Sequence, residues 1–236
     1  MTLPPLAGPL VAWVTAMQLG TANQEQAMGA LDDDFQGVLW FTGDLLPPEL
    51  ALAQLAAGST CGLALPIPGD LGWLPPEALV SGEALMALTA DSTLVITPPG
   101  PGERWWRCLA HPLAPRPQPV LLSFARRELS SAIRGAAEAL EQLGLQRGDP
   151  RLEAHLAEVN SRLARQILPR HIGAVATRVI AQATTVLALT TLGVLSDGAS
   201  VTALEASKRL APLREVSRAA RAALVSAYSD PGTVDR

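Results

Sequence analysis

The feature that most constrains the fold of this chain is a change of sequence pattern near residue 123. From Ser123 onward, apolar residues recur at steps of three and four, which is the spacing of amphipathic helices. Before that point, apolar runs are short and are separated by glycine and proline, as in a small sheet with connecting loops. The pattern predicts an α+β or α/β chain with a small sheet-containing N-terminal part with short helices, followed by a C-terminal helical bundle.

Proline content marks the boundary between these parts. Four prolines between residues 112 and 119 make a stiff, extended connection. We therefore predict an acidic α/β part over residues 1–113, a proline-rich linker over 114–122, a helical bundle over 123–230 and a tail over 231–236.

Charge is distributed unevenly along the 236-residue chain. Residues 1–103 contain 11 acidic and no basic side chains, whereas residues 104–236 contain 18 basic and 11 acidic ones. This asymmetry predicts that the two halves dock on each other, within one chain or between two, or that the second half meets an acidic partner.

Two similar sequence segments in the N-terminal part each indicate a strand, a loop and the start of a helix. They run from Gly37 to Glu49 and from Cys61 to Glu77, with Gly-Asp in the loop and Pro-Pro-Glu at the helix start. The long crossover between them favours parallel neighbouring strands, whose carboxyl ends bind ligands in open α/β sheets. Asp44 and Asp70, with Trp73 in the second loop, are therefore candidate ligand-binding residues, the aspartates as hydroxyl acceptors or as ligands for a divalent ion.

A local role is the alternative for both aspartates. An aspartate that follows a turn glycine can accept bonds from loop amides or cap the next helix. The carboxylates of Asp32–Asp34 indicate an exposed turn or, less simply, part of a metal site. The two cysteines are far apart and the three histidines are scattered, so the sequence predicts no metal site and no cofactor.

Three further strands are predicted over residues 84–88, 93–97 and 104–109. The last should pair back as an antiparallel edge strand across the proline-glycine turn at 98–102. Adjacent Trp105 and Trp106 should then point to opposite faces of the sheet.

The last helical region carries three arginines on one stripe: Arg214, Arg218 and Arg221. They are candidates for an interaction surface, although the modest excess of positive charge makes nucleic acid a less favoured partner. Pro212 should bend this helical region or divide it in two.

No export signal is predicted, because the first basic side chain is Arg104. The most apolar later stretch, residues 183–195, is interrupted by four threonines and a glycine and is too short to cross a bilayer. These features predict a soluble cytoplasmic protein with no membrane partner.

Several motifs lie in positions that are typical of one family. They are Leu65-Pro66-Ile67-Pro68-Gly69-Asp70, the following Leu74-Pro75, Gly82-Glu83-Ala84, and the arginine-rich helical ending at Ala227-Tyr228. On these residues the chain resembles an uncharacterised family of actinobacterial proteins. Its loop at Gly72-Trp73-Leu74-Pro75 is one residue longer than the Gly-Leu-Pro of the family. The resemblance implies a bacterial cytosolic protein and supplies no activity.

These observations favour a non-enzymatic module that self-associates as a homodimer or binds another protein through its helical part. One alternative is a small-ligand-binding or divalent-metal-dependent enzyme with a cleft near Asp44 and Asp70. Another is nucleic-acid binding through the arginine stripe. No nucleophile elbow surrounds Ser92, Ser123 or Cys61, which weakens the enzyme alternative.

Overall fold

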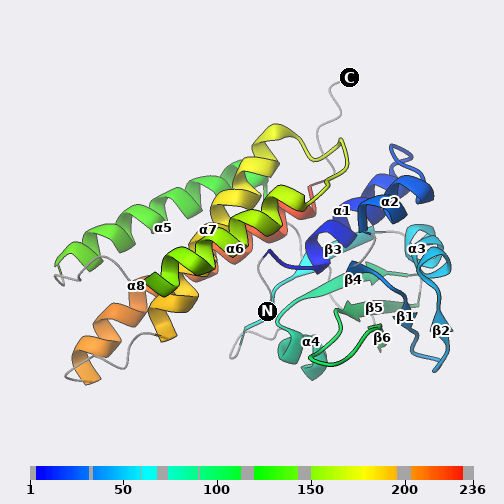
Figure 1. Ribbon diagram of the computed structural model, residues 1–236, viewed down its shortest axis with the longest axis horizontal. Helices are drawn as coiled ribbons and strands as arrows, with labels where there is room; N and C mark the ends of the chain where they lie inside the picture. The colour runs from blue at the N-terminus through cyan, green and yellow to red at the C-terminus, as the bar shows by residue number, and fades with distance from the viewer. Residues whose placement is uncertain are drawn as a thin grey trace. The chain divides into compact units, whose positions relative to one another are not determined.

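The chain divides into two units in a computed structural model, which describes residues 4–31, 34–58, 60–67, 74–89, 91–112, 120–142, 150–195 and 203–230 (Figure 1). The N-terminal unit comprises Met1–Pro119, Gln166–Gly173 and Tyr228–Arg236, and the helical unit comprises Val120–Arg165 and Ala174–Ala227. The chain therefore passes between the units four times. The region predicted as one bundle over residues 123–230 includes two segments that group with the N-terminal unit.

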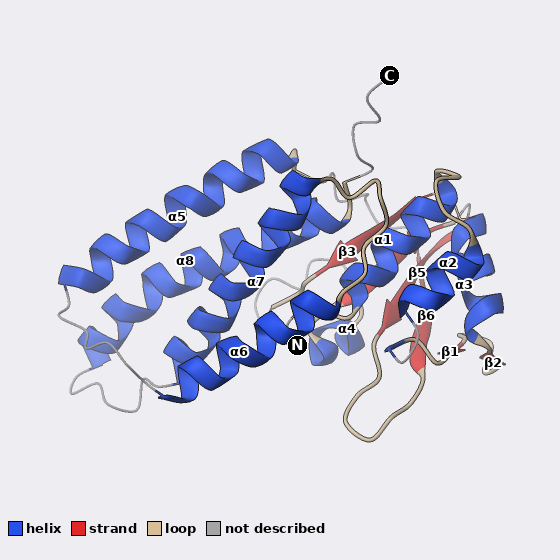
Figure 2. Ribbon diagram, turned by 45° about the horizontal axis from the view of Figure 1, so that its top comes forward, coloured by secondary structure: helices blue, strands red, loops and turns tan. Residues whose placement is uncertain are grey.

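The N-terminal unit is built on a six-stranded mixed sheet with the order β2-β1-β6-β5-β4-β3 (Figure 2). Neighbouring strands are antiparallel except for β1 and β6, which are parallel. Together with the helices that follow, this sheet confirms an α+β chain. The strands are β1 (Val38–Leu39), β2 (Leu45–Leu46), β3 (Thr60–Ala64), β4 (Ala84–Leu88), β5 (Ser92–Thr97) and β6 (Trp106–Pro112).

The predicted parallel pairing of the first two strand-like runs is wrong, because β6, β5 and β4 lie between β1 and β3. Strand β6 pairs with one side of β1, and a tight turn brings β2 to the other side. The amide of Trp40 donates to the carbonyl of Asp44 at 2.8 Å, and Gly43 adopts a φ of +93°. This turn folds Leu45–Leu46 back onto β1 as an antiparallel hairpin before the helix starts.

Strand β6 pairs with β5 in the predicted antiparallel direction, but its predicted edge position is wrong because β1 pairs with its other side. The predicted alternation of the adjacent tryptophans is confirmed. Trp106 is 1% exposed and donates its indole N–H to the carbonyl of Asp34 at 2.8 Å, whereas Trp105 is 36% exposed.

Helices cover both faces of the sheet. Helix α1 (Ala7–Gln18) packs on β3 and β4 and beside α2 (Gln24–Leu31) and α3 (Pro48–Ala57). On this face the Sγ atom of Cys61 lies 3.2 Å from the hydroxyl of Thr15. On the other face, Ala78 of α4 (Pro76–Ser81) packs with Met86 of β4. Because successive strand residues point to opposite faces, β4 is buried on both sides.

Three hydrogen bonds hold the two returning segments within the N-terminal unit. The indole N–H of Trp13 donates to the carbonyl of Ile167 at 3.0 Å. The hydroxyl of Tyr228 donates to Oε1 of Gln166 at 3.0 Å. The amide of Leu63, in strand β3, donates to the hydroxyl of Ser229, also at 3.0 Å. These bonds use side chains from the beginning, middle and end of the chain.

The helical unit contains the long helices predicted after residue 123: α5 (Leu122–Gln142), α6 (Pro150–Arg165), α7 (Ala174–Leu195) and α8 (Ala203–Tyr228), the last of which ends in the N-terminal unit. Helix α6 packs against α7, which also contacts α5. Helix α8 runs through Pro212 without a break, so the proline does not divide it; of the two predicted effects, the bend stays a prediction. The buried residues Val216, Ala219 and Ala220 lie just beyond the proline, and their packing favours continuation of the helix.

Among the described helices, α7 is long and apolar enough over Ala174–Leu192 to cross a membrane, judged by length and composition, with a mean hydropathy of 1.3. This stretch begins before the apolar segment predicted over residues 183–195. Half of it (50%) is buried within the protein, as in a core helix, and this is compatible with a soluble protein.

Candidate functional site

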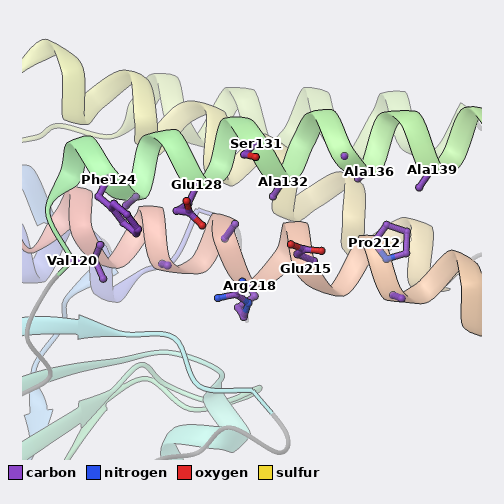
Figure 3. Close-up of a pocket in the computed structure, with 15 residues that line it drawn as sticks. Val120, Phe124, Glu128, Ser131, Ala132, Ala136, Ala139, Pro212, Glu215 and Arg218 are labelled. Atoms are coloured by element: carbon purple, nitrogen blue, oxygen red, sulfur yellow. The ribbon is translucent and has the colours of Figure 1, made fainter.

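A groove with a volume of about 570 Å³ runs between α5 and α8 of the helical unit (Figure 3). The labelled side chains ascend in number along α5 and descend along α8, so the two helices are antiparallel. Small residues dominate the lining. They are Ala125, Ala132, Gly135, Ala136 and Ala139 from α5, and Ala211, Ala219 and Ala222 from α8.

Gly135 gives a measure of the open space in the groove. A Cβ atom added at this position has no other atom within 4 Å, apart from its chain neighbours and the backbone of its own helix. Well-packed bundles fill such positions with large apolar side chains. Here alanine and glycine leave an apolar hollow that side chains from outside the chain can enter.

One end of the groove carries large apolar side chains that are exposed. Val120 and Phe124 line the groove and are 45% and 48% exposed, and neighbouring Leu121 is 77% exposed. The guanidinium carbon of Arg127 lies 6.0 Å from the centroid of the Phe124 ring. Exposed apolar groups beside a hollow are typical of surfaces that bind another protein.

Charges of both signs lie along the same groove. Glu128 lies on α5, and Glu215 and Arg218 lie on α8 (Figure 3). The ion pairs among the described residues, Glu103–Arg107 and Glu158–Arg162, leave all three of these groove side chains without an ionic partner. The groove therefore offers one cation and two anions that can pair with charges on another molecule.

Residues 123–225 match the family model described as "Rv1486c-like protein, C-terminal domain". The match includes every groove-lining residue except Val120 and is consistent with the resemblance to an actinobacterial family; the proline-rich loop lies outside it. No curated protein and no solved structure is significantly similar to the chain.

The three arginines of the predicted stripe differ in how far they are buried. Arg214 and Arg218 are exposed, whereas Arg221 is partly buried. Burial lowers the pKa of the Arg221 guanidinium from its usual value. Arg218 lines the groove, so one of the three predicted interaction residues lies in the candidate site.

The predicted ligand-binding residues fall elsewhere. Asp44 lies in the exposed turn between β1 and β2, where its Oδ2 accepts a hydrogen bond from the hydroxyl of Thr42 at 2.7 Å. Asp70 and Trp73 lie outside the described residues. The bond from Thr42 gives Asp44 a local partner in its own turn, as expected for a turn-stabilising aspartate.

A second hollow, of about 700 Å³, lies in the N-terminal unit beside α4 and the turn at Pro98–Pro101. Its lining includes Glu83, which is 1% exposed. Oε2 of Glu83 accepts a hydrogen bond from the amide of Ala7, at the start of α1, at 2.8 Å. Because helix N-termini carry unpaired amides and partial positive charge, this carboxylate serves as a distant cap for α1.

The described residues contain no group of three or more His, Cys, Asp and Glu side chains placed to hold a metal ion. Both cysteines are buried as free thiols. Burial raises the pKa of Cys61 to about 11 and that of Cys108 to about 12. Both thiols therefore stay protonated near neutral pH, and a thiol is a poor nucleophile.

Sequence reasoning missed the groove. The available signal was the recurrence of alanine and glycine at residues 132, 135, 136 and 139 on one face of α5. Alanine on a helix predicts helix formation equally well on any face. Only the spacing between α5 and α8 distinguishes a tight alanine contact from an open groove.

Proposed function

We propose that this protein is a non-enzymatic self-association module, in which the helical unit of one copy binds a second copy through the α5/α8 groove. One observation carries the proposal: exposed Val120 and Phe124 line one end of a hollow that is otherwise rich in alanine, and Leu121 between them in sequence is also exposed. A single surface thus holds both the large side chains and the space that can receive them.

This combination suits two identical surfaces. Most homo-oligomers have closed symmetry, and a two-fold interface pairs the same patch of both subunits. Burial of a Leu or Phe side chain contributes about 1.5–3 kcal/mol, and a two-fold interface counts each such contact twice. The proposed setting is the cytoplasm, with a homodimer as the functional form.

The alternatives have less support. A metal-dependent enzyme needs several ligands at one place, and Asp44 has a hydroxyl partner within its own turn. Nucleic-acid binding through the arginine stripe needs exposed cations, and Arg221 is partly buried.

Light scattering over a range of protein concentrations tests the proposal, at low salt and at about 0.5 M salt, where exposed charges are screened. We expect a dimer mass in both, because the exposed side chains of Val120, Leu121 and Phe124 are apolar. The double variant Leu121→Glu, Phe124→Ser should be monomeric. Val80→Glu changes a side chain in the N-terminal unit that is 88% exposed, and should remain a dimer.

A groove-filling variant gives a second test. Gly135→Leu places a side chain in open space and should weaken the dimer while the helix remains folded. Gly29→Leu in α2 is its matched control, since a Cβ there also meets no atom within 4 Å. A monomer for the unmodified chain at every concentration, or a dimer unaffected by all groove variants, would falsify the proposal.

A further inference from the structure

We infer that the second copy docks with its two-fold axis along the groove, so that α5 of each copy lies over α8 of the other and Glu128 pairs with Arg218 across the interface. The inference rests on the proposed self-association and adds the orientation of the two copies and the residues that fix it.

The antiparallel arrangement of α5 and α8 determines which side chains meet. Figure 3 places Glu128 on one wall of the groove and Arg218 on the other wall, where Arg218 is displaced from Glu128 toward Pro212 and lies at about the level of Ser131; Phe124 lies toward the opposite end. A two-fold rotation about the groove exchanges the walls and keeps each level unchanged. The long side chain of Arg218 of one copy then reaches along the groove to Glu128 of the other, and the same pair forms a second time.

Side-chain size agrees with this orientation. Ala222 lies one helical turn beyond Arg218, toward the end of the groove that carries Phe124. Exchange of the walls therefore places the half-exposed Phe124 ring of each copy near the small residue Ala222 of the other. Two large side chains then meet small ones, both at the same end of the interface.

The alternative two-fold axis runs across the groove. It would stack α5 on α5 and α8 on α8. With the axis at the level of Glu128, carboxylate would face carboxylate, and such like charges oppose association. With the axis between Glu215 and Arg218, these two residues would pair across the interface instead, so charge reversal at Glu128 distinguishes the two orientations.

Charge reversal tests the inference. In Glu128→Arg, both interface pairs become Arg–Arg, and in Arg218→Glu, both become Glu–Glu. Each single variant should raise the dimer dissociation constant by about ten-fold or more. The double variant Glu128→Arg, Arg218→Glu recreates two attractive pairs and should return to within about three-fold of the unmodified chain. Dilution series by sedimentation or light scattering measure these constants.

Mixing the two single variants gives the sharpest result. In a mixed dimer, the arginine introduced by Glu128→Arg faces the glutamate introduced by Arg218→Glu, and the unchanged Glu128 and Arg218 face each other. Both pairs are attractive, so the mixed dimer should form in preference to either homodimer. Arg126→Glu is the control, because Arg126 is exposed on α5 but does not line the groove. Its dissociation constant should stay within about three-fold of the unmodified value.

The outcomes separate this inference from the proposed function. A dimer that is lost in Leu121→Glu, Phe124→Ser but is insensitive to both charge reversals and to mixing would overturn the orientation and leave self-association standing. A chain that is monomeric at every concentration would overturn both. Thermal melting of each single variant checks folding, and recovery in the double variant or the mixture excludes misfolding as the cause of a lost dimer.

Discussion

The aromatic ring of Tyr228 lies against the backbone of Gly8 in α1, so closely that a Cβ atom at residue 8 would stand 2.6 Å from two ring carbons. Gly8→Ala should therefore lower the free energy of unfolding by about 1–3 kcal/mol, the usual cost of overpacking a core. Gly29→Ala in α2 is the matched control, because it adds the same methyl group in open space. That variant should gain up to about 1 kcal/mol from helix propensity. Urea unfolding measures both, and equal effects would contradict the close contact.

Tyr228 is the single tyrosine of the chain, which makes its ionisation directly observable. Burial raises the pKa of its phenol, and the bond to Gln166 opposes this only in part. Because the raised pKa belongs to the folded state, stability should fall as pH rises above the ordinary tyrosine pKa of about 10. We expect phenolate absorbance to appear together with the loss of helical circular dichroism. Phenolate formation in a protein that is still folded would refute this prediction.

His171 should make the protein less stable in mild acid. Burial lowers the pKa of its imidazole, and the negative charge of Asp230 opposes the change without cancelling it. The unfolded chain then binds a proton more readily than the folded one, so stability is lost as pH falls below about 6.5. Melting temperatures of the unmodified chain and His171→Gln, measured from pH 8 to pH 5 (about the histidine range), test this. Parallel curves for the two proteins would show that His171 is not responsible.

Glu83 should contribute to stability through the start of α1. Glu83→Ala removes the acceptor for the amide of Ala7 and should lower the free energy of unfolding by about 1–3 kcal/mol. Glu83→Gln keeps an oxygen acceptor and should cost less. Glu77→Ala, at an exposed position on α4, serves as the control. An effect of Glu83→Ala no larger than that of Glu77→Ala would argue against the cap.

Divalent ions should leave the melting temperature of the protein unchanged. The carboxylate of Asp44 accepts a bond from Thr42 within an exposed turn, so Asp44→Asn should change stability only slightly and equally with or without Mg²⁺ or Mn²⁺. Asp70→Asn extends the test to the second predicted aspartate. A stabilisation by either ion that one of these substitutions removes would instead support the metal-site alternative.

The sequence predicted most of the helices because their signals are local. Regular apolar spacing indicated α5 to α8, and Pro75-Pro76-Glu77 indicated the start of α4. Strand order was harder, since β1 and β2 are two residues each and their pairing depends on the turn at Gly43. That turn makes β1 and β2 a hairpin that contains Asp44, and β6 takes the place expected for β3 beside β1.

The candidate site was predicted only through Arg218. The groove depends on the distance between helices α5 and α8. The spacing of residues along one helix in the sequence does not determine that distance. The sequence also did not predict that Gln166–Gly173 and Tyr228–Arg236 group with the N-terminal unit. No sequence pattern links Gln166 and Ile167 to Trp13 or Tyr228.

The four passages of the chain between its units affect how such a protein can evolve. The family match at residues 123–225 spans Gln166–Gly173, which belongs by its contacts to the N-terminal unit. A gene fragment that encodes only the matched residues would carry Gln166 and Ile167 without the Tyr228 hydroxyl and the Trp13 indole that bond them. Recombination that moves only this continuous fragment would therefore lose both hydrogen bonds. We expect the two units to be inherited together.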